Sequence, residues 1–217
     1  MNAKAPMPAA PDGATAGAAK TARDRILEAA CAVIAEEGID DMRIARVAMR
    51  AGASTALVHH YFSTREDLLE EALMHSYELA AEDRFGQPVD PNASAVEQLK
   101  VMIDECLPIE GRQHQEWLLW LELWLRAARH EESRPLGRRL YASYRDWMLE
   151  VIRYGVKRGE FETEDPEASA DVAIGLLDGL GIRALMEDPD MDVERVRVLA
   201  ATRIARELGI EPEALTE

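Results

Sequence analysis

Several features common in proteins are scarce in this 217-residue chain, and each scarcity excludes a structural or functional class of protein. The two cysteines, Cys31 and Cys106, form no Cys-x-x-Cys pair, which excludes a disulfide framework and favours a reducing cytoplasm. No stretch approaches the ~18 apolar residues of a membrane span. The first 20 residues contain no apolar core of a secretory signal. We therefore expect a cytoplasmic protein with no membrane partner.

Motifs that carry catalytic or metal chemistry are also missing. The chain has no His-Glu-x-x-His, no paired Glu-x-x-His, no glycine-rich phosphate loop and no nucleophile elbow. Its five histidines are dispersed, and the one adjacent pair, His59 and His60, would point in two directions on a helix. We predict that the protein is not an enzyme and uses no cofactor or metal.

Strand patterns are scarce as well, whereas helical patterns recur along the chain. Aromatic residues make up only 6%, and no useful alternation of apolar and polar residues appears. We predict an all-α fold of about nine helices, divided by caps, glycines and prolines. After a first helix that Gly38 ends and a short second helix, the expected ranges are 55–62, 65–83, 94–107, 113–129, 135–158, 165–188 and 192–208.

Charge is distributed unevenly, although the net charge of −16 argues against a nucleic-acid binder when taken whole. Up to Arg65 the chain has eight Lys or Arg residues and seven Asp or Glu residues, leaving 17 basic and 34 acidic residues beyond it. This asymmetry places any nucleic-acid contact on the N-terminal side. Residues 1–19 are rich in Ala, Pro and Gly, and we expect them to be a disordered tail.

Residues 43–62 have the spacing of a helix-turn-helix. Ala48 is small where a second helix must cross closely, and Val58 can pack back over it. Gly52 lies where a left-handed residue would end the first of the two helices. Ser54 is a suitable N-cap for the second.

The second helix of this unit is predicted to read DNA. Its outward positions carry small or hydrogen-bonding side chains, which suit a major groove: Thr55, Ala56, His59 and His60. Tyr61 can turn its ring inward and keep its hydroxyl at the surface. Solvated surface histidines remain the alternative interpretation of the pair. The next helix opens with Ser63 and Glu66 in a capping-box pattern, where Arg65 could share a phosphate with backbone amides.

The stretch GIDDMRIARVAMRAGASTALVHHYFSTREDLLEEAL resembles the DNA-binding domain of the tetracycline-repressor (TetR) family of transcriptional regulators. The resemblance runs from about residue 22 to 79 and is most specific over 47–54 and at the aromatic pair 61–62. Three positions depart from the residues frequent in the family: Arg43 for Ser or Thr, His59 for Tyr, and Arg65 for Lys. Arg65 keeps the charge of the usual Lys, so only the first two departures bear on individual DNA contacts, and none bears on the domain.

The resemblance implies a DNA-binding domain over 20–80 and an effector-binding and dimerisation domain over 81–217. Within the first domain we expect phosphate contacts from Arg43, His59, Tyr61 and Arg65. We expect Thr55, Ala56 and His60 to lie nearest the base edges. The partner would be double-stranded DNA with a palindromic operator. The fourth helix is longer than the DNA-binding domain needs, so we expect it to act as a lever between the domains.

An aromatic cluster falls in the second domain. Trp117, Trp120 and Trp124 share one helix face at positions i, i+3 and i+7. Further candidate effector-binding residues come from the next two helices: Tyr144, Trp147 and Asp178. The sequence leaves open whether they fill the core or line a pocket. Indole rings with Asp178, Glu116 or Glu122 would suit a cationic amine, and a resemblance of the C-terminal part to the choline-responsive BetI-like branch suggests the same ligand class.

Three glycines, Gly175, Gly179 and Gly181, interrupt the eighth helix. Each costs about 1 kcal/mol relative to Ala, and the pattern alone allows either tight intrachain packing or a self-associating face. The family resemblance favours a homodimer through helices eight and nine. We thus predict a dimeric repressor that a small-molecule effector releases from its operator. A helical protein–protein interaction module is the main alternative, a small all-α enzyme a distant one, and an activator remains open.

Overall fold

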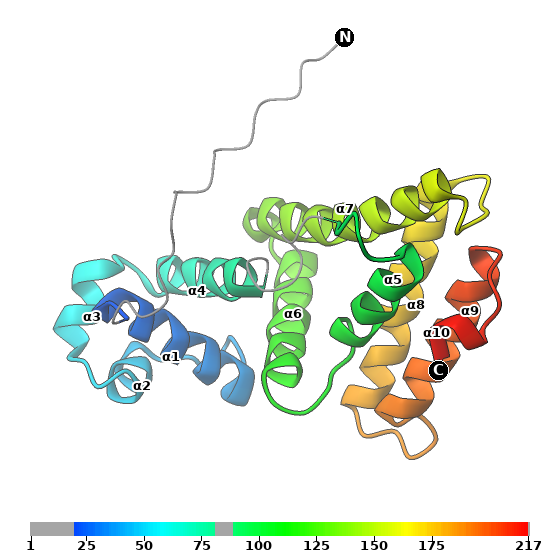
Figure 1. Ribbon diagram of the computed structural model, residues 1–217. Helices are drawn as coiled ribbons and strands as arrows, with labels where there is room; N and C mark the ends of the chain where they lie inside the picture. Colours follow the sequence, from blue (N-terminus) through cyan, green and yellow to red (C-terminus); the bar gives the residue numbers. More distant parts are fainter. Residues whose placement is uncertain (1–19, 81–88, 217) are drawn as a thin grey trace, which may run out of the picture.

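The computed structural model describes residues 20–80 and 89–216, and within these ranges the chain forms ten α-helices, one 3₁₀ turn and no strand. The elements in chain order (Figure 1) are α1 (Ala22–Glu37), α2 (Ile44–Arg50), α3 (Thr55–Tyr61), α4 (Arg65–Ala80), α5 (Ala95–Glu105), α6 (Arg112–Arg129), η2 (Glu131–Ser133), α7 (Arg134–Arg158), α8 (Pro166–Leu185), α9 (Val193–Glu207) and α10 (Glu213–Thr216). The all-α prediction is confirmed. The four-residue α10 is an addition to the nine helices expected. The expected tail over 1–19 and residues 81–83 of the expected fourth helix lie outside the described residues.

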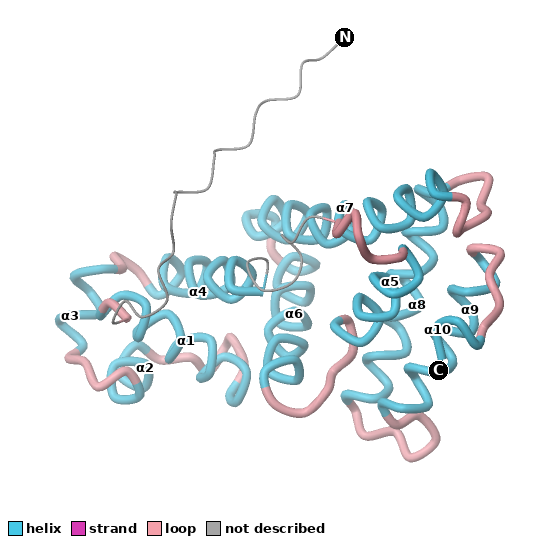
Figure 2. The backbone as a smooth tube through the Cα atoms, viewed as in Figure 1, coloured by secondary structure: helices cyan, strands magenta, loops and turns pink. Residues whose placement is uncertain are grey.

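Helices α1 to α4 pack around one apolar core at the N-terminal end of the molecule (Figure 2). Thr21 begins α1 in a capping box with Asp24, whose amide donates to Thr21 Oγ1 over 3.1 Å. The largest fully buried side chains that α1 to α4 and their turns contribute to this core are Ile26, Leu27, Ile34, Met42, Phe62, Leu68 and Leu69. They come from the helices or the turns between them, so α3, the helix predicted to read DNA, rests on a tightly packed base.

The cap of α4 differs from the expectation. The amide of Asp67 donates to Thr64 Oγ1 over 2.9 Å, and the amide of Thr64 donates to Asp67 Oδ2 over 3.1 Å. The capping box is therefore Thr64 with Asp67, and the predicted pair of Ser63 with Glu66 was wrong by one residue. Because α4 begins at Arg65, the N-cap is Thr64 and the third helical residue is Asp67.

Helices α5 and α7 to α10 surround a second apolar core. Its members lie at helical spacing on the facing sides of these helices, for example Leu99 and Ile103 on α5 and Met148 and Ile152 on α7. None of the described helices combines the length and the apolarity that a bilayer span requires.

Helix α6 stands between the two cores (Figure 1). Leu119 and Leu123 of α6 are buried in the N-terminal core together with Leu140 of α7, although all three lie beyond residue 81. On the side that faces the N-terminal core, α6 packs more extensively against α1 than against α4. The connection between the domains therefore includes the packing of α1 on α6 as well as α4, the helix expected to act as a lever.

Candidate functional sites

The turn between α2 and α3 has the predicted helix-turn-helix geometry. Gly52 adopts φ 62°, a left-handed conformation that a side chain disfavours. The amide of Ala53 donates to Ala48 O over 2.9 Å, which closes the turn. Ser54 Oγ accepts from the amide of Leu57 over 3.1 Å and so caps α3. Val58 is fully buried and belongs to the same core as Ala48, as the spacing predicted.

The outer face of α3 is exposed. The predicted reading residues Thr55, Ala56, His59 and His60 are all exposed, and Tyr61 is 39% exposed. The rings of His60 and Tyr61 contact each other edge to face, with centroids 5.2 Å apart. Arg43 is exposed as well, at the N-cap of α2. These six side chains are available to a partner.

Arg65 differs from the other candidates because its guanidinium group is already engaged. Arg65 Nε donates to Met42 O over 2.8 Å, and Arg65 Nη2 donates to Asp40 O over 3.2 Å and to Ile39 O. The side chain is only 29% exposed. The structure thus places Arg65 against the turn between α1 and α2.

Two other basic residues of α2 are paired with α1. Arg50 donates to both oxygens of Glu36 over 2.5 and 2.7 Å, and Arg46 Nε donates to Glu37 Oε1 over 2.6 Å. The hydrogen bond to Arg50 lowers the pKa of Glu36, and the same bond raises the pKa of Arg50. These exposed pairs orient α2 on α1 and leave less positive charge for DNA than the residue count suggests.

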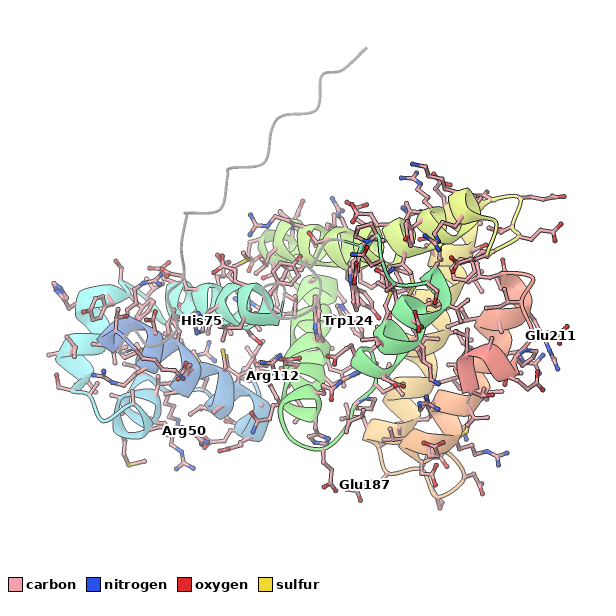
Figure 3. All side chains as sticks on the ribbon, viewed as in Figure 1. Arg50, His75, Arg112, Trp124, Glu187 and Glu211 are labelled. Carbon is pink, nitrogen blue, oxygen red and sulfur yellow. The ribbon has the colours of Figure 1, made fainter. Side chains whose placement is uncertain are left out.

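A cavity lies between α5, α6, α7 and α8, and Trp124 of α6 is one of the residues that line it (Figure 3). Its enclosed part measures about 40 Å³, and the cavity continues into space that is open to solvent. The lining residues are Glu105, Cys106, Gln113, Glu116, Trp117, Trp120, Trp124, Tyr144 and Asp178. Five of the six residues predicted to bind an effector therefore lie together on this cavity, hereafter the aromatic cavity.

Two other residues considered from the sequence lie elsewhere. Trp147 contacts the ring of Tyr144, with centroids 6.4 Å apart, but does not line the aromatic cavity. Glu122 lies on the opposite face of α6 and contacts the turn after α1. Sequence reasoning missed Glu105, Cys106 and Gln113, because only the fold-back from α5 to α6 brings them to the cavity.

The indole rings of α6 are fixed by their neighbours. Trp117 Nε1 donates to Cys106 O over 3.1 Å, which ties α6 to the end of α5. Trp124 lies between Trp117 and Trp120, with ring centroids 6.4 and 6.1 Å away. Trp124 Nε1 is buried and has no hydrogen-bond partner among the described residues. The three rings form a continuous aromatic wall.

The polar side of the aromatic cavity is acidic. Burial raises the pKa of Asp178 to about 6, and this outweighs the hydrogen bond that it accepts from the hydroxyl of Tyr141 over 3.0 Å, which lowers the pKa. Burial also raises the pKa of Tyr144, so this phenol is neutral. Glu116 pairs with Arg112 over 3.1 Å at the cavity edge. Aromatic faces next to a buried carboxylate favour a positively charged guest.

Two family models match the sequence. Residues 26–72 match "Bacterial regulatory proteins, tetR family", and residues 95–209 match "BetI-type transcriptional repressor, C-terminal". The first match contains the helix-turn-helix, and the second contains every residue that lines the aromatic cavity.

Individual relatives agree with the family models. The chain is 28% identical over 190 residues to the HTH-type transcriptional regulator BetI 1 of Chromohalobacter salexigens, covering 86% of this chain and 90% of that one. Among solved structures, a transcriptional regulator from Saccharomonospora viridis in complex with choline superimposes with a TM-score of 0.79 and 31% identity, covering 86% of this chain and 97% of that chain. A TetR-family regulator from Rhodococcus sp. gives a TM-score of 0.73 and 27% identity, covering 86% and 98%.

Proposed function

The chain belongs to the TetR family of DNA-binding transcriptional regulators and has a BetI-type C-terminal domain, and from this premise we propose how it works. It is a homodimeric repressor of the cytoplasm that binds a palindromic operator and leaves it when a quaternary ammonium compound such as choline binds. No catalytic step is assigned to any residue. The observation that carries the effector class is the aromatic cavity with Asp178 on its wall.

The proposed DNA surface is the exposed face of α3 with the start of α2. Thr55, Ala56 and His60 lie nearest the base edges, and Arg43, His59 and Tyr61 hold phosphates. Phosphate contacts dominate affinity, so operator binding weakens steeply as salt rises. Arg65 was assigned to phosphate from the sequence, but its bonds to three carbonyl groups favour an indirect contribution.

The proposed dimer uses α8 and α9. A Cβ added at Gly175 or Gly179 would meet nothing within 4 Å, so the two glycines leave open space on one side of α8. Val172 on α8 and Val198 on α9 are 52% and 41% exposed and add apolar area. A two-fold partner covering this face sets two α3 helices about 34 Å apart, one helical turn of DNA.

The proposed effector is a quaternary ammonium cation such as choline. The wall formed by Trp117, Trp120, Trp124 and Tyr144 offers ring faces to a trimethylammonium group, and Asp178 supplies the opposite charge. The solved relative that contains choline supports this class of ligand. The effector must bind the DNA-incompetent conformation more tightly, because equal affinity for both states would shift nothing.

Duplexes selected from a random library by the purified protein provide the test. We expect the recovered sequences to contain an inverted repeat, and choline to release the protein from them. The neutral isostere 3,3-dimethyl-1-butanol has the shape without the charge and should not release it. Release by both compounds would overturn the cation assignment, and absence of DNA binding at low salt would favour the interaction-module alternative.

The dimer has its own test in sedimentation velocity. Gly175→Arg should place a charged side chain into the interface and give monomers that bind the operator weakly. Val101→Arg is the control, because Val101 is 61% exposed and lies on α5, which is not part of the proposed interface. If the Gly175→Arg protein remains dimeric, the interface does not include this face of α8.

A further inference from the structure

The 38–43 segment, which connects α1 to α2, is held from two sides. The amide of Ile39 donates to Glu122 Oε2 of α6 over 3.3 Å. The carbonyl of the same residue accepts from the guanidinium group of Arg65, at the start of α4. One residue of this segment is therefore bonded to α6 through its N–H and to α4 through its C=O.

Arg65 also holds two other residues of the segment besides Ile39. Its Nη2 also donates to Asp40 O, and its Nε donates to Met42 O, the residue before Arg43. A planar guanidinium group can serve several carbonyls at once, whereas a lysine ammonium cannot reproduce this fork. Because α3 ends at Tyr61 and α4 begins at Arg65, these bonds join the segment that enters α2 to the start of the helix that follows α3.

Helix α6 connects this arrangement to the aromatic cavity. Glu122 lies two residues from both Trp120 and Trp124, which places it about 200° around the helix, on the opposite side. Leu119 and Leu123, 6% and 2% exposed, anchor the same helix in the N-terminal core. Since packed interiors deform little, a displacement of α6 by a ligand moves Glu122 with it.

The hydrogen bond of Glu122 is formed in an unfavourable electrostatic setting. Its carboxylate approaches the C-terminal end of α1, where the helix dipole is negative and the last turn contains no basic residue. Asp40 lies nearby, and Arg126 and Arg129 line the same small cavity and offset the repulsion. Because the amide nitrogen of Ile39 and Glu122 Oε2 are already 3.3 Å apart, a small shift of α6 can lengthen this bond beyond hydrogen-bond distance.

We infer that Glu122 and Arg65 are positioning residues that couple α6 to the reading helix through the 38–43 segment, and that effector binding changes operator affinity through this coupling. The inference rests on the proposed function, because it requires an effector in the aromatic cavity. Neither residue contacts the effector. Arg65 contributes to DNA affinity by orienting α2 and α3.

The first experiment compares variants of Glu122 in the full-length protein, with choline chloride as the probe. Glu122→Ala removes the acceptor, so the ratio of operator Kd with and without choline should fall at least about fivefold. Glu122→Gln keeps an acceptor oxygen and should restore the ratio. Glu150→Ala removes the same charge from an exposed position on α7 and should leave the ratio at the parent value.

The outcomes separate this inference from the proposed function. A parent protein that ignores choline overturns both. A Glu122→Ala protein that responds to choline like the parent overturns only the coupling. If Glu122→Ala does not fold, amide exchange of Ile39 in the parent decides: choline should change its rate at least about tenfold, and an unchanged rate during operator release overturns the coupling.

A second experiment addresses Arg65. Arg65→Lys keeps the charge but loses the fork, so it should lower operator affinity as much as Arg65→Ala does. Both variants should keep the parent's slope of log K against log salt. Direct phosphate binding predicts instead that Arg65→Ala lowers the slope by about one unit while Arg65→Lys retains it, and that result would overturn the assignment.

Discussion

Gly181 of α8 provides the space that the indole of Trp117 occupies. A Cβ built on Gly181 would lie 2.4 Å from Trp117 Cη2 and 2.5 Å from Trp117 Cζ2, closer than such atoms can approach. The absence of a side chain at one position of α8 therefore determines where one wall of the aromatic cavity stands.

Gly181→Ala should push Trp117 toward the aromatic cavity. We expect choline affinity to fall at least about tenfold, since overpacking forces side chains from their preferred rotamers, while operator binding without choline persists. Isothermal titration measures the first and fluorescence anisotropy the second. Adding Trp117→Phe to Gly181→Ala relieves the contact and should restore part of the volume. Parent-like choline affinity in Gly181→Ala would mean that Trp117 does not shape the site.

Choline affinity should depend on pH through Asp178. Burial raises the pKa of this carboxyl to about 6, so it is ionised at pH 8 and mostly protonated at pH 5. The cation binds the ionised form better, and affinity should fall as pH decreases through about 6. Titrations between pH 5 and 8 test this. A flat profile would remove Asp178 from the cation site.

Asp178→Asn should stabilise the folded protein without ligand. Between pH 3.8, the ordinary value for Asp, and about 6, the folded state binds a proton more tightly than the unfolded state, so ionisation of Asp178 costs stability as pH rises. At pH 7 the variant should gain up to about 3 kcal/mol in urea unfolding, and the gain should vanish below about pH 4.

The control for this prediction is Asp171→Asn on the same helix. The hydrogen bond from Arg145 lowers the pKa of Asp171, so removing its charge should bring no gain at pH 7. Equal stabilisation by both variants would indicate a general charge effect of this acidic chain rather than burial of one carboxyl.

Arg43→Ala should weaken binding to every DNA sequence alike. Arg43 is exposed at the N-cap of α2, and removing a phosphate-binding side chain there should lower the salt slope by about one unit. Arg138→Ala, which removes an exposed arginine of α7, is the matched control and should retain the slope. A change in sequence preference instead would reassign Arg43 to a base contact.

The helix-turn-helix was predictable because its determinants are local. Its three determinants lie within a few residues of one another, and each has the predicted role: Gly52 is left-handed, Ser54 caps α3 and Val58 is buried. The cap of α4 was misplaced by one residue, since Ser63 and Thr64 are both good caps and only the observed helix start distinguishes them.

The aromatic cavity was only partly predictable. Helical spacing placed Trp117, Trp120 and Trp124 on one face, but it could not show whether that face fills the core or surrounds a space. The glycines of α8 were equally ambiguous. Gly181 packs against Trp117 within the chain, whereas a Cβ added at Gly175 or Gly179 would meet nothing within 4 Å, so the three glycines lie in two different environments.

The sequence by itself determined the all-helical class, the reading helix and its exposed face, because backbone hydrogen bonding and side-chain periodicity depend on near neighbours in the chain. Only the tertiary structure decided that Arg65 holds the turn before α2, that Glu122 faces away from the indoles, and that Asp178 is partly buried beside them. The bonds of Arg65 and Glu122 to Ile39 join residues 26 and 83 positions apart, and no local pattern encodes which distant carbonyl or amide a side chain will meet.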